Sequence, residues 1–149
     1  MAIKTAKEYI QSLRNLKLDL YLFGEKVENW VEHPVIRPSI NAVAMSYKVA
    51  HEPKNEALAT TESMLTGKKV NRFNALFKST EELVNKIKLQ KELGQRAGVC
   101  FQRCVGMDGI NAVFSTTYEI DQKYGTGYHQ RFRKWLKYVQ ERTFVSKVL

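Results

Sequence analysis

The sequence predicts an all-α protein that forms a single helical domain over residues 1–149. Glycine and proline, which interrupt helices, are sparse, at 8 and 3 residues. Apolar residues recur at helical spacing through most of the chain, and two capping-box sequences mark helix starts. A hydrophobic content of 44% is enough to build a folded core rather than a disordered chain.

The N-terminal segment predicts an amphipathic helix that begins at Thr5 and ends near Leu16. Thr5 and Glu8 have the spacing of a capping box, in which each side chain accepts a hydrogen bond from the other residue's backbone N–H. Apolar residues then recur at positions 6, 9, 10, 13 and 16, which is the spacing of one helix face. We expect this face to pack against the core.

Residues 18–33 predict a less regular connection. Leucines at 18, 20 and 22 alternate with other residues, a pattern that leaves both a short extended segment and a helix open before the break at Gly24. The stretch 25–33 can form a short helix that buries Val27 and Trp30.

The next predicted helix is capped by Ser39 and ends before Pro53. Its apolar positions are 40, 43, 44, 47 and 50. Residues 54–71 carry the weakest signals and predict only one or two short turns. Gly67, followed by two lysines, is expected at an exposed loop tip.

A long helix is predicted to begin at the second capping box, Ser79 to Glu82, and to continue toward the two cysteines. Leu83 and Ile87 are among its apolar positions. Two glycines, at 94 and 98, lower its helix propensity by about 1 kcal/mol each relative to alanine. We expect them to mark helix–helix contact or, as the alternative, close approach of a bound group.

The chain is predicted to end in two more helices. Asp108 caps the first, which runs to Tyr124 and stops at Gly125. Thr126 caps the second, whose apolar positions are 132, 135, 136 and 139. Its basic residues lie mostly outside this stripe, which favours a core-facing helix with a solvated back over a membrane-binding or nucleic-acid-binding one.

The net charge of +9 suits nucleic acid, an anionic membrane surface, or a phosphate-bearing molecule such as a coenzyme A ester or flavin nucleotide. The basic residues form small separate groups with no DNA- or RNA-binding signature, so we expect no nucleic-acid partner. No apolar run approaches the length of a membrane span, and no apolar leader precedes the first helix. We therefore expect a cytoplasmic protein with no membrane partner.

Two cysteines, Cys100 and Cys104, lie four residues apart in a stretch that reads as helix. This spacing puts both on one helix face, within reach of one metal centre or cluster. Two ligands are half of what a closed zinc site or an ordinary iron–sulfur cluster needs, so two packed core thiols are the alternative. The three histidines have no motif spacing, and no phosphate-binding loop or nucleophile motif is present.

The segment Cys100-Phe-Gln-Arg-Cys-Val-Gly-Met-Asp108 resembles the cluster-binding segment of the 4-hydroxybutyryl-CoA dehydratase family. Other blocks that resemble the N-terminal region of that family are residues 23–30, 33–34, 36–41, 71–73, 114–125 and 128–129. The resemblance covers nearly everything from Ala6 to Glu141.

This resemblance implies the helical N-terminal domain of an acyl-CoA dehydrogenase-like fold in a homo-oligomeric enzyme. The implied enzyme is a lyase with isomerase activity, which dehydrates 4-hydroxybutyryl-CoA and uses FAD and a 4Fe-4S cluster. The resemblance further implies that Cys100 and Cys104 are two ligands of the cluster, and that Gln102 lies near the cluster and the acyl-CoA substrate. The remaining ligands would come from later domains of the family chain.

Two departures from the family bear on activity. The family chain continues through further domains that hold the other ligands and much of the flavin site, and residues 142–149 no longer follow its pattern. We therefore expect this domain to be inactive alone. The alternatives are a domain of the related flavin-dependent 4-hydroxyphenylacetate 3-monooxygenases, which need not carry the thiols, and a non-catalytic helical assembly module.

Overall fold

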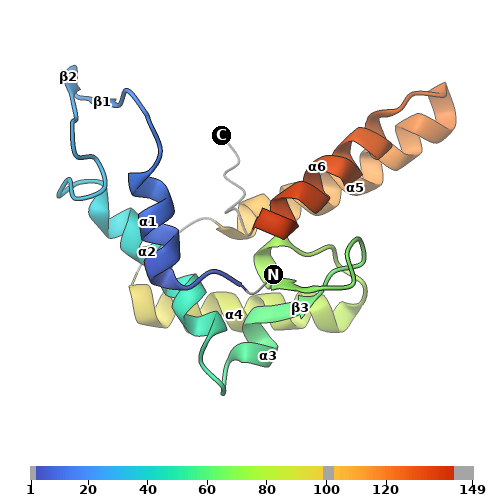
Figure 1. Ribbon diagram of the computed structural model, residues 1–149. Coiled ribbons are helices and arrows are strands. Elements are labelled where there is room, and N and C mark those ends of the chain that lie inside the picture. Colours follow the sequence, from blue (N-terminus) through green and yellow to red (C-terminus); the bar gives the residue numbers. More distant parts are fainter. Residues whose placement is uncertain (1–2, 99–102, 143–149) are drawn as a thin grey trace.

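The computed structural model describes residues 3–98 and 103–142. Its described part is mostly helical, which confirms the all-α prediction (Figure 1). The elements in chain order are α1 (Ala6–Arg14), β1 (Tyr21–Leu22), β2 (Glu25–Lys26), α2 (Arg37–Ala50), α3 (Glu56–Ala59), β3 (Thr60–Glu62), β4 (Lys69–Asn71), the 3-10 turn η1 (Arg72–Asn74), α4 (Thr80–Ala97), α5 (Arg103–Tyr124) and α6 (Tyr128–Arg142).

The main core lies where α1, α2 and α4 pack together with η1 and the start of α5. Tyr47, Phe73, Leu93 and Met107 are fully buried in it, and the rings of Tyr9 and Tyr47 stack with centroids 4.9 Å apart. Burial of such large apolar side chains is the dominant favourable term in folding. The apolar face predicted for the first helix thus lies against α2, as its buried residues show.

A second, smaller core joins α5 and α6 to the rest of the molecule. Leu76, Ile110 and Leu136 form its buried centre, with Phe114 and Phe132 packed beside them. Beyond this core the two antiparallel helices run side by side away from the body (Figure 1). A two-stranded hairpin, β1–β2, projects from another part of the molecule, beside α1 and α2 (Figure 1).

The prediction of a short helix over residues 25–33 is wrong. Glu25 and Lys26 form strand β2, which pairs antiparallel with β1, and turns follow it. Leu22 and Glu25 pair across a two-residue turn at Phe23 and Gly24, so the extended alternative for the preceding segment is the correct one. The residues expected to be buried by that helix, Val27 and Trp30, are only half-buried.

Helix α2 confirms the predicted apolar face and end but not the predicted cap. It begins at Arg37, with a proline in the first turn, so Ser39 lies inside the helix rather than at its N-cap. Positions 40, 44, 47 and 50 are buried. The helix ends at Ala50, before Pro53 as predicted.

The segment from 54 to 71 is more ordered than the sequence indicated. It contains the single-turn helix α3 and the antiparallel pair β3–β4, in which Thr60 pairs with Asn71. Gly67 has a φ of +63° in the exposed loop between the strands, as expected for a loop tip. The β3–β4 hairpin lies along α4 (Figure 1). The carboxylate of Glu82 on α4 accepts a hydrogen bond from the Thr61 hydroxyl of β3.

Helix α4 is capped by Ser79 as predicted and begins at Thr80, but it buries a different face. Its buried residues are Lys86, Leu89 and Leu93, whereas Leu83 and Ile87 are exposed. Lys86 is therefore part of the packed face, because it reaches an acidic partner on α5.

The helix ends at Ala97, since Gly98 adopts a left-handed φ of +65° as its C-cap. The predicted helix therefore does not continue beyond Gly98 toward the two cysteines. Gly94 and Gly98 also do not mark close helix–helix contact, because a Cβ built at either would meet no heavy atom within 4 Å among the described residues.

Gly94 lies inside α4, whereas Gly98 has a left-handed backbone, so alanine at the two positions should change stability in opposite directions. Replacing Gly94 by alanine should raise the free energy of unfolding by about 1 kcal/mol, because the site is helical and open. Replacing Gly98 by alanine should lower it by about 1 kcal/mol, since the left-handed backbone disfavours a Cβ. Urea unfolding followed by circular dichroism measures both, and equal effects of the two variants would contradict the assignment.

The turn between α5 and α6 is organised by Asp121. Its carboxylate accepts hydrogen bonds from Thr126 Oγ1 at 2.6 Å and from the backbone N–H groups of Tyr128 and His129 at 2.9 Å each. Asp121 therefore caps α6 from the neighbouring helix, and the prediction that Thr126 caps it is wrong. Gly125 ends α5 as predicted, with a φ of +64°.

The same hydrogen bonds predict a pH dependence. Burial opposes ionisation of Asp121, but the bonds from Thr126, His129 and Tyr128 outweigh it and lower its pKa below the ordinary 3.8. Its contribution to stability is therefore complete above about pH 4 and is lost as the pH falls through the lower, folded-state pKa. The pKa values of Glu8, Glu32, Glu52 and Glu56 are lowered as well.

We expect the thermal midpoint of the wild-type chain to fall as the pH is lowered from 5 to 2. Asp121→Asn should lower the midpoint by a few degrees at pH 6 and make its acid dependence shallower, because the carboxylate that must be protonated is gone. Asp19→Asn is the matched control, since Asp19 belongs to an exposed surface ion pair. An acid dependence that is identical in Asp121→Asn and wild type would contradict the cap.

Candidate functional site

The candidate site lies where α4 ends and α5 begins. Of the predicted site residues, Cys100 and Gln102 lie outside the described residues. The backbone of Cys104 belongs to the first turn of α5, which confirms its placement on a helix. Four residues further along α5, Asp108 occupies the same face one turn away.

An ion pair joins the two helices beside this face. The ammonium of Lys86 on α4 binds the carboxylate of Asp108 on α5, and it also lies 5.6 Å from the centre of the Phe77 ring. The Lys86 side chain is only 9% exposed, whereas that of Asp108 is 56% exposed. Asp108 therefore fixes α5 against α4, and the prediction that it caps a helix starting there is wrong, because α5 already begins at Arg103.

The start of α5 is held rigidly on its buried side. Gly106 and Met107, two and three residues after Cys104, are buried, and Met107 is fully enclosed in the main core. Asn111, one turn later, donates from Nδ2 to the backbone oxygens of Met107 and Ala75 and accepts from the N–H of Phe77 at 2.7 Å. These bonds fix the segment that carries Cys104 relative to the loop after η1.

A buried polar network that reaches α4 one turn before Lys86 was not predicted. Arg72 is 3% exposed and donates to the backbone oxygens of Ala57, Leu58 and Thr60 at 3.0, 2.7 and 2.9 Å. Its guanidinium also pairs with Glu82 of α4, which accepts a further hydrogen bond from Thr61. Burial of an arginine depends on such tertiary partners, which no local sequence pattern shows.

Gln140 makes a second polar connection, between α6 and the centre of the molecule. Its Nε2 donates to the backbone oxygen of Asn74 at 2.7 Å, and its Oε1 accepts from Ser63 at 2.5 Å. All three residues are buried. The end of α6 is thereby fixed to η1 and to the loop after β3.

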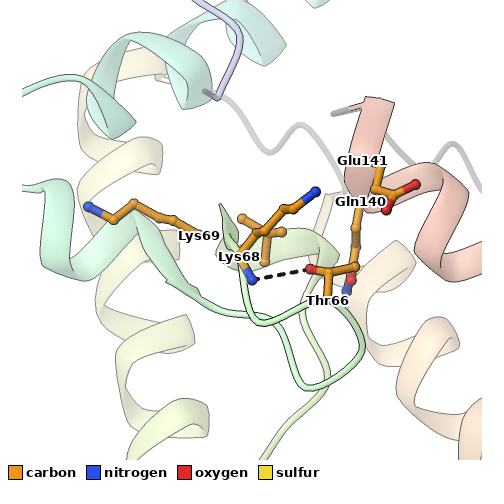
Figure 2. A pocket seen from close by; sticks show the side chains of 6 residues that line it. Thr66, Lys68, Lys69, Gln140 and Glu141 are labelled. Carbon is orange, nitrogen blue, oxygen red and sulfur yellow. Dashed lines mark hydrogen bonds between the residues drawn. The ribbon is translucent and has the colours of Figure 1, made fainter. Parts of the chain in front are cut away.

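A shallow hollow of about 290 Å³ opens where the β3–β4 loop meets the end of α6 (Figure 2). It is lined by Thr66, Lys68, Lys69, Val70, Gln140 and Glu141. Lys69 extends away from it and pairs with Glu56 at 2.6 Å, so the charges that line it are those of Lys68 and Glu141 (Figure 2). One charge of each sign does not define an anion or cation site.

The three histidines make structural contacts. His51 Nε2 lies 3.0 Å from the backbone oxygen of Ile3, and His33 Nδ1 accepts from the N–H of Val35 at 3.3 Å. His129 contacts Thr117 Oγ1 and lies edge-on to the Phe114 ring. Among the described residues no group of three or more His, Cys, Asp or Glu side chains is arranged to hold a metal.

The described residues include no helix that is both long enough and apolar enough to cross a membrane.

Comparison with a family of known sequences gives a match over residues 5–148. The family is described as 4-hydroxyphenylacetate 3-hydroxylase N terminal. The match spans all the described elements from α1 to α6.

Two curated relatives, which are named for different reactions, also match the chain. The chain is 59% identical over 143 residues to the 4-hydroxybutyryl-CoA dehydratase/vinylacetyl-CoA-Delta-isomerase of Clostridium aminobutyricum, covering 96% of this chain and 29% of that protein. It is 27% identical over 148 residues to the oxygenase component of 4-hydroxyphenylacetate 3-monooxygenase of Thermus thermophilus, again with 96% and 29% coverage. The chain thus spans less than a third of the length of these relatives.

Two solved structures are also similar. An oxygen-tolerant 4-hydroxybutyryl-CoA dehydratase from N. maritimus superimposes with a TM-score of 0.91 at 53% identity, over 97% of this chain and 28% of that one. The oxygenase component of 4-hydroxyphenylacetate 3-monooxygenase, solved with FAD, gives a TM-score of 0.66 at 21% identity, over 94% and 28%. The second likeness shows a shared fold alone.

Proposed function

The chain belongs to the 4-hydroxyphenylacetate 3-hydroxylase N-terminal family, and from this premise we propose that it acts as the N-terminal domain of a 4-hydroxybutyryl-CoA dehydratase/vinylacetyl-CoA-Delta-isomerase. The single observation that supports this choice is the much higher identity to the dehydratase than to the monooxygenase over the same stretch. The domain would act together with the remaining two thirds of the enzyme and be inactive alone. We place the enzyme in the cytoplasm, where its two thiols stay reduced.

The proposed role of the domain is to supply two thiolates to a 4Fe-4S cluster, from Cys100 and Cys104. The donor set fits half of such a cluster, since four ligands are the rule and two cysteines four residues apart can share one helix face. Among the described residues no group of three or more His, Cys, Asp or Glu side chains is arranged to hold a metal, and we propose that downstream domains supply the other half of the ligands. When bound, the cluster and FAD supply Lewis-acid and redox chemistry.

The residues of this chain would position those thiolates. The Lys86–Asp108 pair fixes α5 against α4 one turn after Cys104, and Asn111 fixes the following turn. Because the two charges of this pair oppose each other, the pair positions the segment and adds no net charge beside the thiolates. Gln102, between the cysteines in sequence, is proposed to contact the acyl-CoA substrate.

A second candidate is supported by the family description and by the shared fold of the monooxygenase oxygenase component. In that case the domain would belong to a flavin-dependent aromatic hydroxylase and the thiols would have no cluster to bind. A third, non-catalytic assembly module would retain the fold and bind neither flavin nor iron. The dehydratase proposal differs from both because it assigns a role to Cys100 and Cys104.

The test is an activity assay on a two-part enzyme. The chain is mixed anaerobically with a downstream fragment of the Clostridium dehydratase, iron, sulfide and FAD, and the mixture is assayed with 4-hydroxybutyryl-CoA and with 4-hydroxyphenylacetate. We expect dehydration only in the complete mixture, and none from either part alone. Hydroxylation of the aromatic substrate, assayed in parallel with reduced flavin and O2, would favour the second candidate, and no activity with no flavin binding would favour the third.

A further inference from the structure

The most exposed large apolar side chain of the described residues is Phe23, at the tip of the β1–β2 hairpin. It is 90% exposed, and Leu18 and Tyr21, which precede it in the chain, are also exposed. The hairpin projects from the body of the molecule, so its own chain leaves the tip uncovered (Figure 1). We refer to residues 18–25 as the finger.

The backbone at the tip adopts a conformation that is unfavourable for the phenylalanine found there. Phe23 has a φ of +52°, and it is the one non-glycine residue with positive φ in the described part of the chain. Gly24 follows with a φ of +86°, and positive φ at both central residues defines the hairpin turn that normally takes Asn-Gly or Gly-Gly. A bulky side chain is unfavourable there both for the backbone and for exposure of apolar surface. Neither folding nor solubility accounts for a phenylalanine at this position.

A surface that complements the finger lies on α6. Tyr128, Arg131 and Trp135 follow one another at helical spacing on one exposed face, and the Arg131 guanidinium lies 4.7 Å from the centre of the Tyr128 ring. We call these three residues the α6 stripe. Tyrosine, tryptophan and arginine are the side chains that most often dominate binding at protein interfaces.

The charges of the two surfaces are also complementary. Residues 17–28, which contain the finger, carry three acidic and two basic side chains, a net charge of −1 in a chain of +9. Residues 128–142, which form α6, carry five basic and one acidic, a net charge of +4. The finger is thus an acidic region of a basic protein, and opposite local charge orients two partners on approach.

We propose that the finger of one copy of this chain docks on the α6 stripe of a second copy, with Phe23 as the anchor. The finger and α6 project from different parts of the molecule, so the contact is between copies and not within one (Figure 1). Two copies that exchange fingers reciprocally form a closed dimer with two-fold symmetry. This inference does not depend on the proposed catalysis and requires neither cluster nor flavin.

Sedimentation velocity on the 149-residue chain over a range of concentrations tests this inference without iron or flavin. We expect a concentration-dependent dimer. Phe23→Gly should weaken dimerisation by about 30-fold or more while leaving the thermal midpoint of the monomer unchanged or raised, because the variant relieves the strained turn. Loss of dimer with retained folding separates docking from stability.

Two further variants locate the contact. Arg131→Glu should weaken dimerisation as strongly as Phe23→Gly, since it reverses the charge of the α6 stripe. Met64→Ser, an exposed apolar residue in the β3–β4 loop, is the control and should dimerise like wild type. A wild-type chain that stays monomeric, or a Phe23→Gly chain that dimerises normally, overturns the proposal. If the finger binds a downstream fragment of the dehydratase instead, its partner is not a second copy and the proposal is wrong. The proposed catalysis would be unaffected by that result.

Discussion

Arg72→Met is expected to lower the free energy of unfolding by about 3–5 kcal/mol, the largest stability effect predicted for this chain. Methionine fills similar volume but cannot donate, so three backbone oxygens and the Glu82 carboxylate lose their partner in a buried environment. The total stability of a domain is usually about 5–15 kcal/mol, so the variant should be close to unfolding at body temperature. Urea unfolding followed by circular dichroism measures the change.

Arg14→Met is the matched control, because it makes the same substitution in a surface ion pair. Arg14 binds Glu32 at 2.5 Å, but the two side chains are 50% and 40% exposed, so water replaces the lost interaction. We expect little change in stability. If the two variants destabilise the chain equally, the network around Arg72 does not hold β3, β4 and α4 together as described.

The double variant Cys100→Ser with Cys104→Ser is expected to abolish dehydratase activity in the two-part enzyme. Serine keeps the size of cysteine but is a poor ligand for iron, and loss of half of the ligands should reduce activity by about 100-fold or more. The thermal midpoint of the isolated chain should change little. Activity with 4-hydroxybutyryl-CoA, measured after anaerobic reconstitution, gives the result.

Val105→Ser serves as the control for this variant, since Val105 lies next to Cys104 in α5 and is more than half exposed. It should keep wild-type activity. A double cysteine variant that loses stability but retains activity would indicate that the thiols are packed core residues, which is the alternative that their spacing left open.

Local sequence signals predicted the helices well where the governing contacts are local. The capping box of Thr5 and Glu8 is present with both of its hydrogen bonds, and the glycine after Tyr124 ends α5 in a left-handed conformation. The apolar face of α2 is buried at the predicted spacing. Each of these features is determined by residues within one or two helical turns of one another.

The predictions failed where a partner distant in sequence decides the outcome. Lys86 and Arg72 are buried because Asp108 and Glu82 reach them from other segments, whereas the sequence alone assigns lysines and arginines to the solvated side of a helix. Asp121 caps α6 from seven residues upstream, beyond the spacing of any capping box.

The β1–β2 hairpin was missed because its turn lacks the usual sequence signal. Phe23-Gly24 replaces the Asn-Gly or Gly-Gly that marks a two-residue hairpin, so the alternation of leucines before it remained ambiguous. The candidate site was predicted in part: the helix that carries Cys104 is confirmed, and its support by Lys86, Asp108 and Asn111 became visible only in the folded chain.

The central claim is that this domain contributes ligands to a shared iron–sulfur site, and the most direct measurement is iron and sulfide content after gel filtration. The chain, the downstream dehydratase fragment and their mixture are reconstituted anaerobically and compared with a mixture that contains the double cysteine variant. We predict about four irons and four sulfides per complex in the wild-type mixture, and far less in each single part and in the variant mixture. Equal iron in the wild-type and variant mixtures would contradict the claim.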